Sequence, residues 1–301
     1  MSFARALQSD LIKISGGHSW CEGAAWLAHS QQLVFSDVKK SCLYRYDTHS
    51  QETVLITAQS NYSNGNVALQ NGDLVSCEHG RRCLSLRRAS QLDQAAVLVE
   101  KFEGKRLNSP NDVVERHSDG TLWFTDPPYG IINDEEGYKS ESQIIGCWVY
   151  CFDPKTGQLH LATTDVQRPN GLAFSPDEST LYVADMSIVE FPECGRKEVR
   201  AYRVNHYQLE QGKTLFTVDK GIPDGMTVDR HGQLYCSSSE GILIYSPEQQ
   251  RLIGKIPVPE VVSNCTFDHT QTRLFITAST SVYAIDVDID YIAQLSLQPQ
   301  T

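Results

Sequence analysis

One short sequence pattern recurs six times along the chain. Each copy has a turn, then a leucine, then a short run of β-branched or aromatic residues, and the leucines are Leu33, Leu74, Leu122, Leu181, Leu234 and Leu274. The leucines lie 41, 48, 59, 53 and 40 residues apart, the length of one blade of a β-propeller. The chain is therefore predicted to be all-β and to fold as a six-bladed β-propeller with four-stranded blades around a central channel.

The segments between the repeats support one continuous ring. Helical periodicity is almost absent, and no linker or low-complexity stretch divides the chain, so residues 1–301 are predicted to form a single propeller domain. Each repeat is followed by a hairpin pattern, such as WVYCFDPKTGQLHLA at 148–162, which predicts the outer strands of a blade. The N-terminal LIKIS at 11–15 could supply the last strand of the sixth blade and close the ring.

An oxygen-bearing side chain lies ten or eleven residues before every repeat leucine. These residues are Glu22, Asn64, Asn111, Asn170, Asp224 and Asn264, and four of the six are followed by glycine. Equivalent positions in a propeller repeat lie at equivalent heights around the axis. The six side chains are therefore expected at the start of the innermost strands, converging on one mouth of the channel.

Two carboxylates and several amide carbonyls make a set of hard oxygen ligands, which suits Ca²⁺ or Mg²⁺, with Mn²⁺ also possible. Without a cation, two facing carboxylates in a dry channel would be costly. Asn-Gly and Asp-Gly are also common turn dipeptides, so each position alone could be a turn residue. All six residues lie at nearly the same distance from a repeat leucine, however, and this shared spacing favours a metal site.

A second set of residues follows each repeat leucine by four positions: Asp37, Glu78, Asp126, Asp185, Ser238 and Ala278. We expect Asp37 and Asp185 to end a strand and bind backbone groups at the other side of the blade from the first ring. Polar and aromatic residues follow Glu78 and Asp126, including His79 and Tyr129. These two segments either fold toward the pocket or form surface loops.

The net charge, the length of the apolar runs and the cysteine spacing argue against several other classes of protein. A formal charge of −11 argues against nucleic acid binding, and no apolar run approaches membrane-spanning length. The first twenty residues lack a signal-peptide pattern, which predicts a cytoplasmic protein. The nine cysteines are scattered without a CxxC pair, and no GxSxG, HExxH or phosphate-loop motif occurs.

The chain from Glu22 to about Asp286 resembles the family of senescence marker protein 30, gluconolactonases and luciferin-regenerating enzymes. The resemblance lies in EGAAW, RLNSPNDVV with WFTDPPYG, RPNGLAFSPDESTLYVAD and DGMTVDRHGQLYCS. SCEHGRR and NSPNDVV are most similar to the bacterial gluconolactonases.

This resemblance implies a propeller enzyme with one catalytic divalent metal, calcium first, with zinc, manganese or magnesium as alternatives. The metal ligands would be Glu22, Asn170 and Asp224, with Asn111 as a substrate contact or further ligand. Asp224 would also be the general base. The substrate would be a small sugar lactone such as glucono-1,5-lactone.

The resemblance leaves the substrate contacts and the rival functions open. An arginine that binds substrate in the animal lactonases is replaced by Ser109, and Arg106 could take its place. His79 and Tyr129 are further candidates for substrate binding. The alternatives are a related hydrolase acting on phosphotriesters or aryl esters, and a non-enzymatic calcium-binding propeller. We expect a monomer or weak homodimer.

Overall fold

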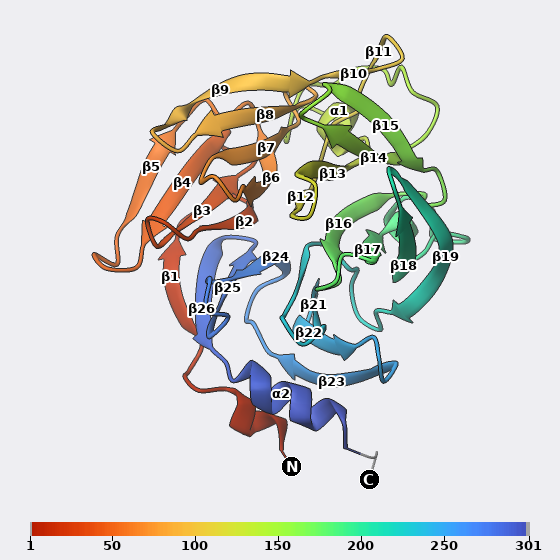
Figure 1. Ribbon diagram of the computed structural model, residues 1–301. Helices are drawn as coiled ribbons and strands as arrows, with labels where there is room; N and C mark the ends of the chain where they lie inside the picture. The colour runs from red at the N-terminus through yellow and green to blue at the C-terminus, as the bar shows by residue number, and fades with distance from the viewer. Residues whose placement is uncertain (1, 299–301) are drawn as a thin grey trace.

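The computed structural model describes residues 2–298 and shows six four-stranded antiparallel sheets arranged in a ring (Figure 1). The sheets are named blades 1 to 6 in chain order, with strands given from the channel outward. Blade 1 consists of β2 (Cys21–Leu27), β3 (Gln32–Asp37), β4 (Cys42–Asp47) and β5 (Thr53–Thr57). Blade 2 consists of β6 (Ser63–Ala68), β7 (Leu74–Glu78), β8 (Cys83–Arg88) and β9 (Gln91–Val99). Blade 3 consists of β12 (Val113–Arg116), β13 (Thr121–Asp126), β14 (Trp148–Asp153) and β15 (Gln158–Thr163).

The second half of the ring repeats this arrangement. Blade 4 consists of β16 (Pro169–Phe174), β17 (Thr180–Asp185), β18 (Glu198–Asn205) and β19 (Gln208–Thr217). Blade 5 consists of β20 (Met226–Val228), β21 (Leu234–Ser238), β22 (Gly241–Ser246) and β23 (Arg251–Ile256). Blade 6 consists of β24 (Val262–Phe267), β25 (Arg273–Ala278), β26 (Ser281–Asp286) and β1 (Ile12–Gly16). The predicted six-bladed propeller is confirmed.

The ring is closed by the N-terminal segment. Strand β1 pairs antiparallel with β26, with Ile12 opposite Ala284, so LIKIS supplies the outermost strand of blade 6 as predicted. The 3₁₀ turn η1 (Phe3–Ala6) contacts helix α2 (Ile289–Ser296) outside the ring (Figure 1). Asp288 is the N-cap of this helix, and its side chain accepts a hydrogen bond from the Tyr291 N–H at 2.9 Å. Within residues 2–298 no helix is long and apolar enough to cross a membrane.

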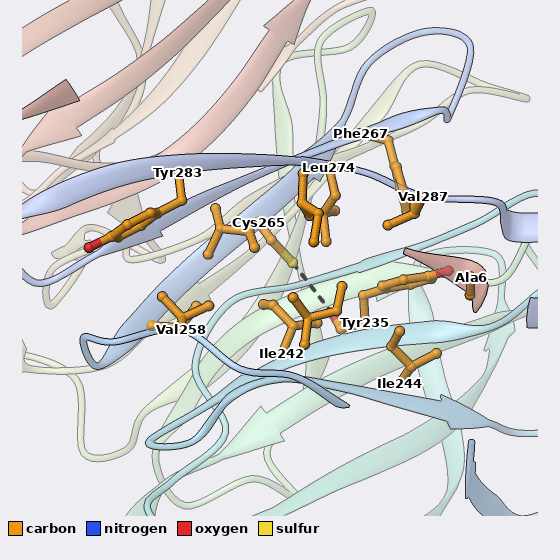
Figure 2. Close-up of a cluster of buried hydrophobic side chains, with 14 of the residues drawn as sticks. Ala6, Tyr235, Ile242, Ile244, Val258, Cys265, Phe267, Leu274, Tyr283 and Val287 are labelled. Carbon is orange, nitrogen blue, oxygen red and sulfur yellow. Dashed lines mark hydrogen bonds between the residues drawn. The ribbon is translucent and has the colours of Figure 1, made fainter. Parts of the chain in front are cut away.

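The core consists of apolar layers between neighbouring blades. All six repeat leucines are at most 1% exposed, which explains why the pattern is apolar at this position. Figure 2 shows the layer between blades 5 and 6, where Tyr235 and Ile242 pack against Cys265 and Leu274, with Ala6 at its edge. Each blade thus covers one face of the next, and a blade alone could not bury its apolar surface.

Hydroxyl groups on the first or second strand of a blade hold neighbouring blades together near the channel. The Ser36 Oγ of blade 1 donates to the Asn64 carbonyl of blade 2 at 2.8 Å, and the Thr125 Oγ1 of blade 3 donates to the Asn170 carbonyl of blade 4 at 2.8 Å. Between blades 6 and 1, the Ser263 Oγ donates to the Cys21 carbonyl at 2.6 Å. These bonds fix the backbone of neighbouring blades at the channel mouth.

Three connections are longer than the rest and explain the uneven repeat spacing. A small hairpin of β10 (Lys101–Phe102) and β11 (Lys105–Arg106) lies between blades 2 and 3. Residues 127–147 join β13 to β14 and include the short helix α1 (Tyr129–Ile132); we call them the cover segment. In blade 4, the turn η2 (Ser187–Val189) follows β17.

Candidate metal centre and substrate pocket

A cavity of about 270 Å³ lies at one mouth of the channel. Five of the six predicted ring residues line it: Glu22, Asn64, Asn111, Asn170 and Asp224. The remaining lining residues are Trp20, Tyr129, Ile132, Asn133, Glu135, Glu136, Met186 and Ile222. No lysine, arginine or histidine is among the residues that line this cavity in the described part of the chain.

The sixth ring residue, Asn264, lies outside this cavity. Its Oδ1 accepts the Cys265 N–H at 2.7 Å, and its Nδ2 lies 3.5 Å from the Asp112 Oδ2. Asn264 and Asp112 line a separate cavity of about 320 Å³. The six-fold pattern therefore predicts one more cavity residue than the folded ring provides.

The ring positions are tightly packed at the backbone, and this explains the glycines that follow four of them. A Cβ atom on Gly23 would lie 2.1 Å from the Asn64 carbonyl oxygen, and one on Gly171 would lie 2.2 Å from the Asp224 carbonyl oxygen. At these two positions the next blade comes so close that only glycine leaves room for it. The ring positions of neighbouring blades are therefore in close backbone contact.

Glu22 and Asp224 are the two carboxylates of the ring, and both are buried, with 4% and 9% of their surface exposed. Burial raises the pKa of Glu22 well above its ordinary value, and the charge of Asp224 adds to the effect. Burial likewise raises the pKa of Asp224, with repulsion from Asp112 as the next cause. Across residues 2–298 neither carboxylate forms an ion pair with a basic side chain. Such a pair suits a bound cation, which would compensate both charges.

The asparagines of the ring are held by their surroundings. The Asn170 Nδ2 donates to the Met186 Sδ at 2.9 Å, which leaves its Oδ1 as the atom available to a cation. The Asn111 N–H donates to the Thr125 carbonyl at 2.9 Å, and the Asp224 N–H donates to the Ser237 Oγ at 2.9 Å. Two carboxylates and three amides form a hard oxygen set of the kind that binds calcium. The described residues contain no cluster of three or more His, Cys, Asp and Glu side chains that could hold a metal ion, so any metal site here depends on the amide oxygens.

Asp112 is a buried acid that the sequence reasoning missed. It is 6% exposed, and burial raises its pKa to about 7, while hydrogen bonds such as that from the Val113 N–H oppose the rise. It occupies the position that is glycine in four other repeats, and a Cβ on Gly65 would lie 2.5 Å from its Oδ1. The available sequence signal was an acidic residue at a position where four other repeats have glycine.

The second set of acids lies at the same end of the blades as the ring. Cys21 pairs with Asp37 and Pro169 pairs with Asp185, because the first two strands of a blade form an antiparallel hairpin. The expectation that these acids lie at the other side of the blade is therefore wrong. Their expected bonding is confirmed: Asp37 accepts the Ser19 N–H at 3.0 Å, and Asp185 accepts the Gln167 N–H at 3.2 Å.

Of the candidate substrate-binding residues, some line the cavity and others lie outside it. Tyr129 lines the cavity, and its buried hydroxyl has no hydrogen-bond partner among the described residues. His79 is fully buried outside the cavity lining, and its Nδ1 contacts the Glu136 carbonyl at 3.0 Å. Burial lowers the pKa of His79 to about 4, so its ring is neutral at pH 7 and Nδ1 is the donor.

Arg106 also lies outside the cavity lining, because its guanidinium donates to the Arg81 carbonyl at 2.6 Å. Ser109 instead anchors the cover segment: its Oγ donates to the Pro127 carbonyl at 2.7 Å and accepts the Gly130 N–H at 2.9 Å. The cover segment supplies Ile132, Asn133, Glu135 and Glu136 to the cavity, and sequence reasoning named none of these. The spacing of 59 residues between two repeat leucines was the signal for an insertion at this point.

Comparisons with known proteins agree with this geometry. Residues 20–280 match the SMP-30/Gluconolactonase/LRE-like region family. A gluconolactonase from Zymomonas mobilis is 30% identical over 295 residues, which cover 90% of this chain and 80% of that protein. A gluconolactonase structure from Xanthomonas campestris is 34% identical, with a TM-score of 0.88 over 96% of this chain and 93% of its own.

A more distant structure shares the fold. It is a calcium-binding protein, regucalcin, from Agrobacterium tumefaciens, with 15% identity and a TM-score of 0.73 over 93% of this chain and 94% of that one. The family match spans blades 1 to 5, strands β24 and β25 of blade 6, and the ring residues from Glu22 to Asn264. The chain therefore belongs to the SMP-30/gluconolactonase/LRE-like family, as a propeller enzyme related to the gluconolactonases.

Proposed function

We propose that this chain is a metal-dependent hydrolase that opens sugar lactones such as glucono-1,5-lactone to aldonic acids. The observation that carries the proposal is the pair of buried carboxylates, Glu22 and Asp224, which meet three asparagines at the channel mouth without a basic partner in residues 2–298. The gluconolactonases among its relatives cover most of the chain and supply the substrate class.

The metal would be held by Glu22, Asn170 and Asp224, with Asn111 beside them. Calcium is the first candidate because the donors are all oxygen, and a relative of the same fold is a calcium-binding protein. Zinc, manganese and magnesium are the alternatives. When bound, the cation would polarise the lactone carbonyl and stabilise the charge that develops on its oxygen.

The protein side chains would then move the proton and hold the substrate. Asp224 would act as the general base toward water, since its carboxyl group lines the cavity beside the other proposed ligands. The Asn111 amide and the unpartnered Tyr129 hydroxyl line the same cavity and would orient the lactone through its hydroxyl groups. His79 and Arg106 lie outside the lining and have no assigned contact with substrate.

The test is hydrolysis of glucono-1,5-lactone by protein stripped with EDTA and then given Ca²⁺, Zn²⁺, Mn²⁺ or Mg²⁺. We expect the stripped protein to be inactive and at least one metal to restore turnover. Glu22→Gln should weaken binding of that metal about tenfold or more by calorimetry, because one of two charged ligands is lost.

A parallel assay with a phosphotriester and an aryl ester separates the related reactions. The preferred substrate should exceed the others in kcat/KM by orders of magnitude. Calcium binding without hydrolysis of any of the three would contradict the enzyme assignment and favour a non-enzymatic calcium-binding propeller.

A further inference from the structure

Asn108 is a buried amide that neither the ring nor the proposed substrate contacts use. It lies between β11 and β12, a few residues before the ring residue Asn111. It is 1% exposed, and it is not among the residues that line the cavity. A buried amide needs partners for both its nitrogen and its oxygen. Those partners show which part of the structure Asn108 holds.

The partners of the Asn108 side chain lie at the two ends of the cover segment. Its Nδ2 donates to the Asp126 carbonyl at 3.1 Å and to the Gly146 carbonyl at 2.9 Å. These two acceptors fix the orientation of the amide, because only the nitrogen can donate. Its Oδ1 is in contact with the Ser142 Oγ. One side chain therefore joins the residue before the cover segment to residues near its far end.

The amide of Asn108 acts where the sheet stops holding the chain. The ladder between β13 and β14 ends at the pair of Asp126 and Trp148, and residues 127–147 form no strand. Asn108 bridges the two chains at the point where they separate. Its own N–H donates to the Asp126 Oδ2 at 2.8 Å, so its backbone is bound to the same strand. Without the amide, two carbonyl groups would lose a donor, which is costly at a buried site.

Other hydrogen bonds of the cover segment hold one part of it each. Ser109 binds its beginning, through the Pro127 carbonyl and the Gly130 N–H. Arg82 binds its middle, where the Nη1 donates to the Ser140 Oγ at 3.0 Å. The amide of Asn108, in contrast, reaches both ends.

The ring residue nearest in sequence is held without Asn108. The Asn111 N–H donates to the Thr125 carbonyl at 2.9 Å, and the Asn111 carbonyl accepts the Gly65 N–H at 2.7 Å. Loss of the Asn108 amide should therefore loosen the cover segment and leave the ring in place.

We propose that Asn108 is a positioning residue, which holds the cover segment over the cavity and thereby sets the affinity for substrate. The statement about substrate rests on the proposed lactonase function. The cover segment supplies several residues of the cavity lining, including Tyr129. If the segment is loose, these groups must be ordered when substrate binds, and that cost raises KM.

Trypsin cleavage measures the position of the cover segment without any need for metal or activity. Lys139 is the only lysine or arginine in residues 127–147, and it is exposed. In Asn108→Ala we expect cleavage after Lys139 to be about tenfold faster or more, because the lost hydrogen bonds raise the population of the opened segment. Cleavage at sites outside the segment should keep the wild-type rate. Mass spectrometry of the fragments identifies each site.

Steady-state kinetics on glucono-1,5-lactone with the activating metal give the second measurement. In Asn108→Ala the KM should rise about tenfold, while kcat should change less than about threefold because the ring is unaltered. The metal affinity measured by calorimetry should equal that of the wild type.

Leu209→Ala is the control for lost stability alone. Leu209 is a buried residue of the outermost strand of blade 4, with 7% of its surface exposed. The substitution should lower the urea midpoint of unfolding, because it removes core packing. The KM and the rate of cleavage at Lys139 relative to other sites should stay as in the wild type.

Three results in a folded Asn108→Ala would each overturn the assignment: unchanged cleavage at Lys139, equal acceleration at all tryptic sites, or an unchanged KM. If Asn108→Ala does not fold, Ser142→Ala decides. This exposed serine contacts Asn108 and Ile144, and its loss should speed cleavage at Lys139 about threefold, whereas an unchanged rate would refute the role of Asn108. If the wild type hydrolyses no lactone, the proposed function fails, and the trypsin result still decides whether Asn108 positions the segment.

Discussion

At the scale of single residues, burial gives the ring its chemistry. Glu22 and Asp224 are ordinary acids in the sequence, but the closed ring removes their water and places them near Asp112. The residue pattern predicted six side chains for the cavity, because the repeat places them at one height, and five of them line it. The pattern could have singled out Asp112, an acid where four repeats have glycine, but not its raised pKa, because desolvation depends on the neighbouring blades.

Asp224→Asn should abolish lactone hydrolysis while leaving the fold intact. The amide cannot accept a proton from water, so we expect kcat to fall about 100-fold or more. Removing a buried charge should also leave the metal-free protein at least as stable as the wild type. Steady-state kinetics and thermal unfolding check both statements, and near-normal turnover would remove Asp224 from the mechanism.

His79 should give the protein a specific loss of stability in acid. Its pKa is about 4 when folded, against about 6.5 in an unfolded chain, because burial outweighs the hydrogen bond to the Glu136 carbonyl. The unfolded chain therefore binds the extra proton between these values. The stability from the neutral ring is complete above about pH 6.5 and is lost as the pH falls toward 4.

Urea unfolding at pH 7 and pH 4.5 measures this loss. The wild type should lose roughly 2–3 kcal/mol more than His79→Gln between the two conditions. The comparison with the variant is needed because Asp112 and Asp126, with pKa values raised to about 7, change stability in the opposite direction. An equal loss in both proteins would contradict the prediction.

At the scale of the strand, the neighbouring blade limits the size of the side chain that fits at the start of an inner strand. The glycines after the ring residues look like turn glycines in the sequence, and the dipeptide alone supports that interpretation. In the structure Gly171 lies within β16 and is required because the backbone of Asp224 approaches it. Sequence alone identified the residue type, and the reason for it came from the adjacent blade.

Gly171→Ala should therefore destabilise the protein and disturb the ring together. The new Cβ would meet the Asp224 carbonyl oxygen at 2.2 Å, and such overpacking costs about 1–3 kcal/mol. Because Asp224 must shift, hydrolysis should fall as well. Gly16→Ala is the control: its nearest neighbour is the Lys13 Cδ at 3.5 Å, so the change should be within about 0.5 kcal/mol. Equal effects of the two substitutions in urea unfolding would contradict the packing argument.

The cover segment is the element whose course the sequence left open. Residues 78–82 and 126–130 were predicted either to fold toward the pocket or to form surface loops. In the structure Tyr129 lines the cavity, whereas His79 lies outside its lining and hydrogen-bonds to the Glu136 carbonyl of the cover segment. Hydrogen bonds between groups as far apart as Ser109 and Gly130 decide this, and no local pattern encodes them.

At the scale of the whole molecule, closure of the ring depends on residues from both ends of the chain. Strand β1 completes blade 6, and Ala6 lies in the core between blades 5 and 6 (Figure 2). Phe3, Leu7 and Leu11 pack against the same core. Without β1, strand β26 would have a free edge. The site at the channel mouth depends on this closure, since blade 6 binds blade 1 through Ser263 and Cys21.

Deleting residues 1–16 should lower the free energy of unfolding by roughly 5 kcal/mol or more, because several apolar side chains lose their burial. Urea unfolding followed by fluorescence measures the change. Adding a peptide of residues 1–17 in trans should restore part of the stability, since it binds only the folded ring. A deletion variant as stable as the full chain would show that closure does not need β1.

The sequence by itself determined the number of blades, the strand that closes the ring and the ring positions, because all three follow from a repeat with a fixed period. Only the tertiary structure decided that Asn264 lies outside the pocket, that Arg106 is held by Arg81, and that Glu136 lines the same cavity as the two ring carboxylates. Those outcomes depend on contacts between residues brought together by ring closure. Burial, and with it the raised pKa of each ring acid, exists only once all six blades are in place.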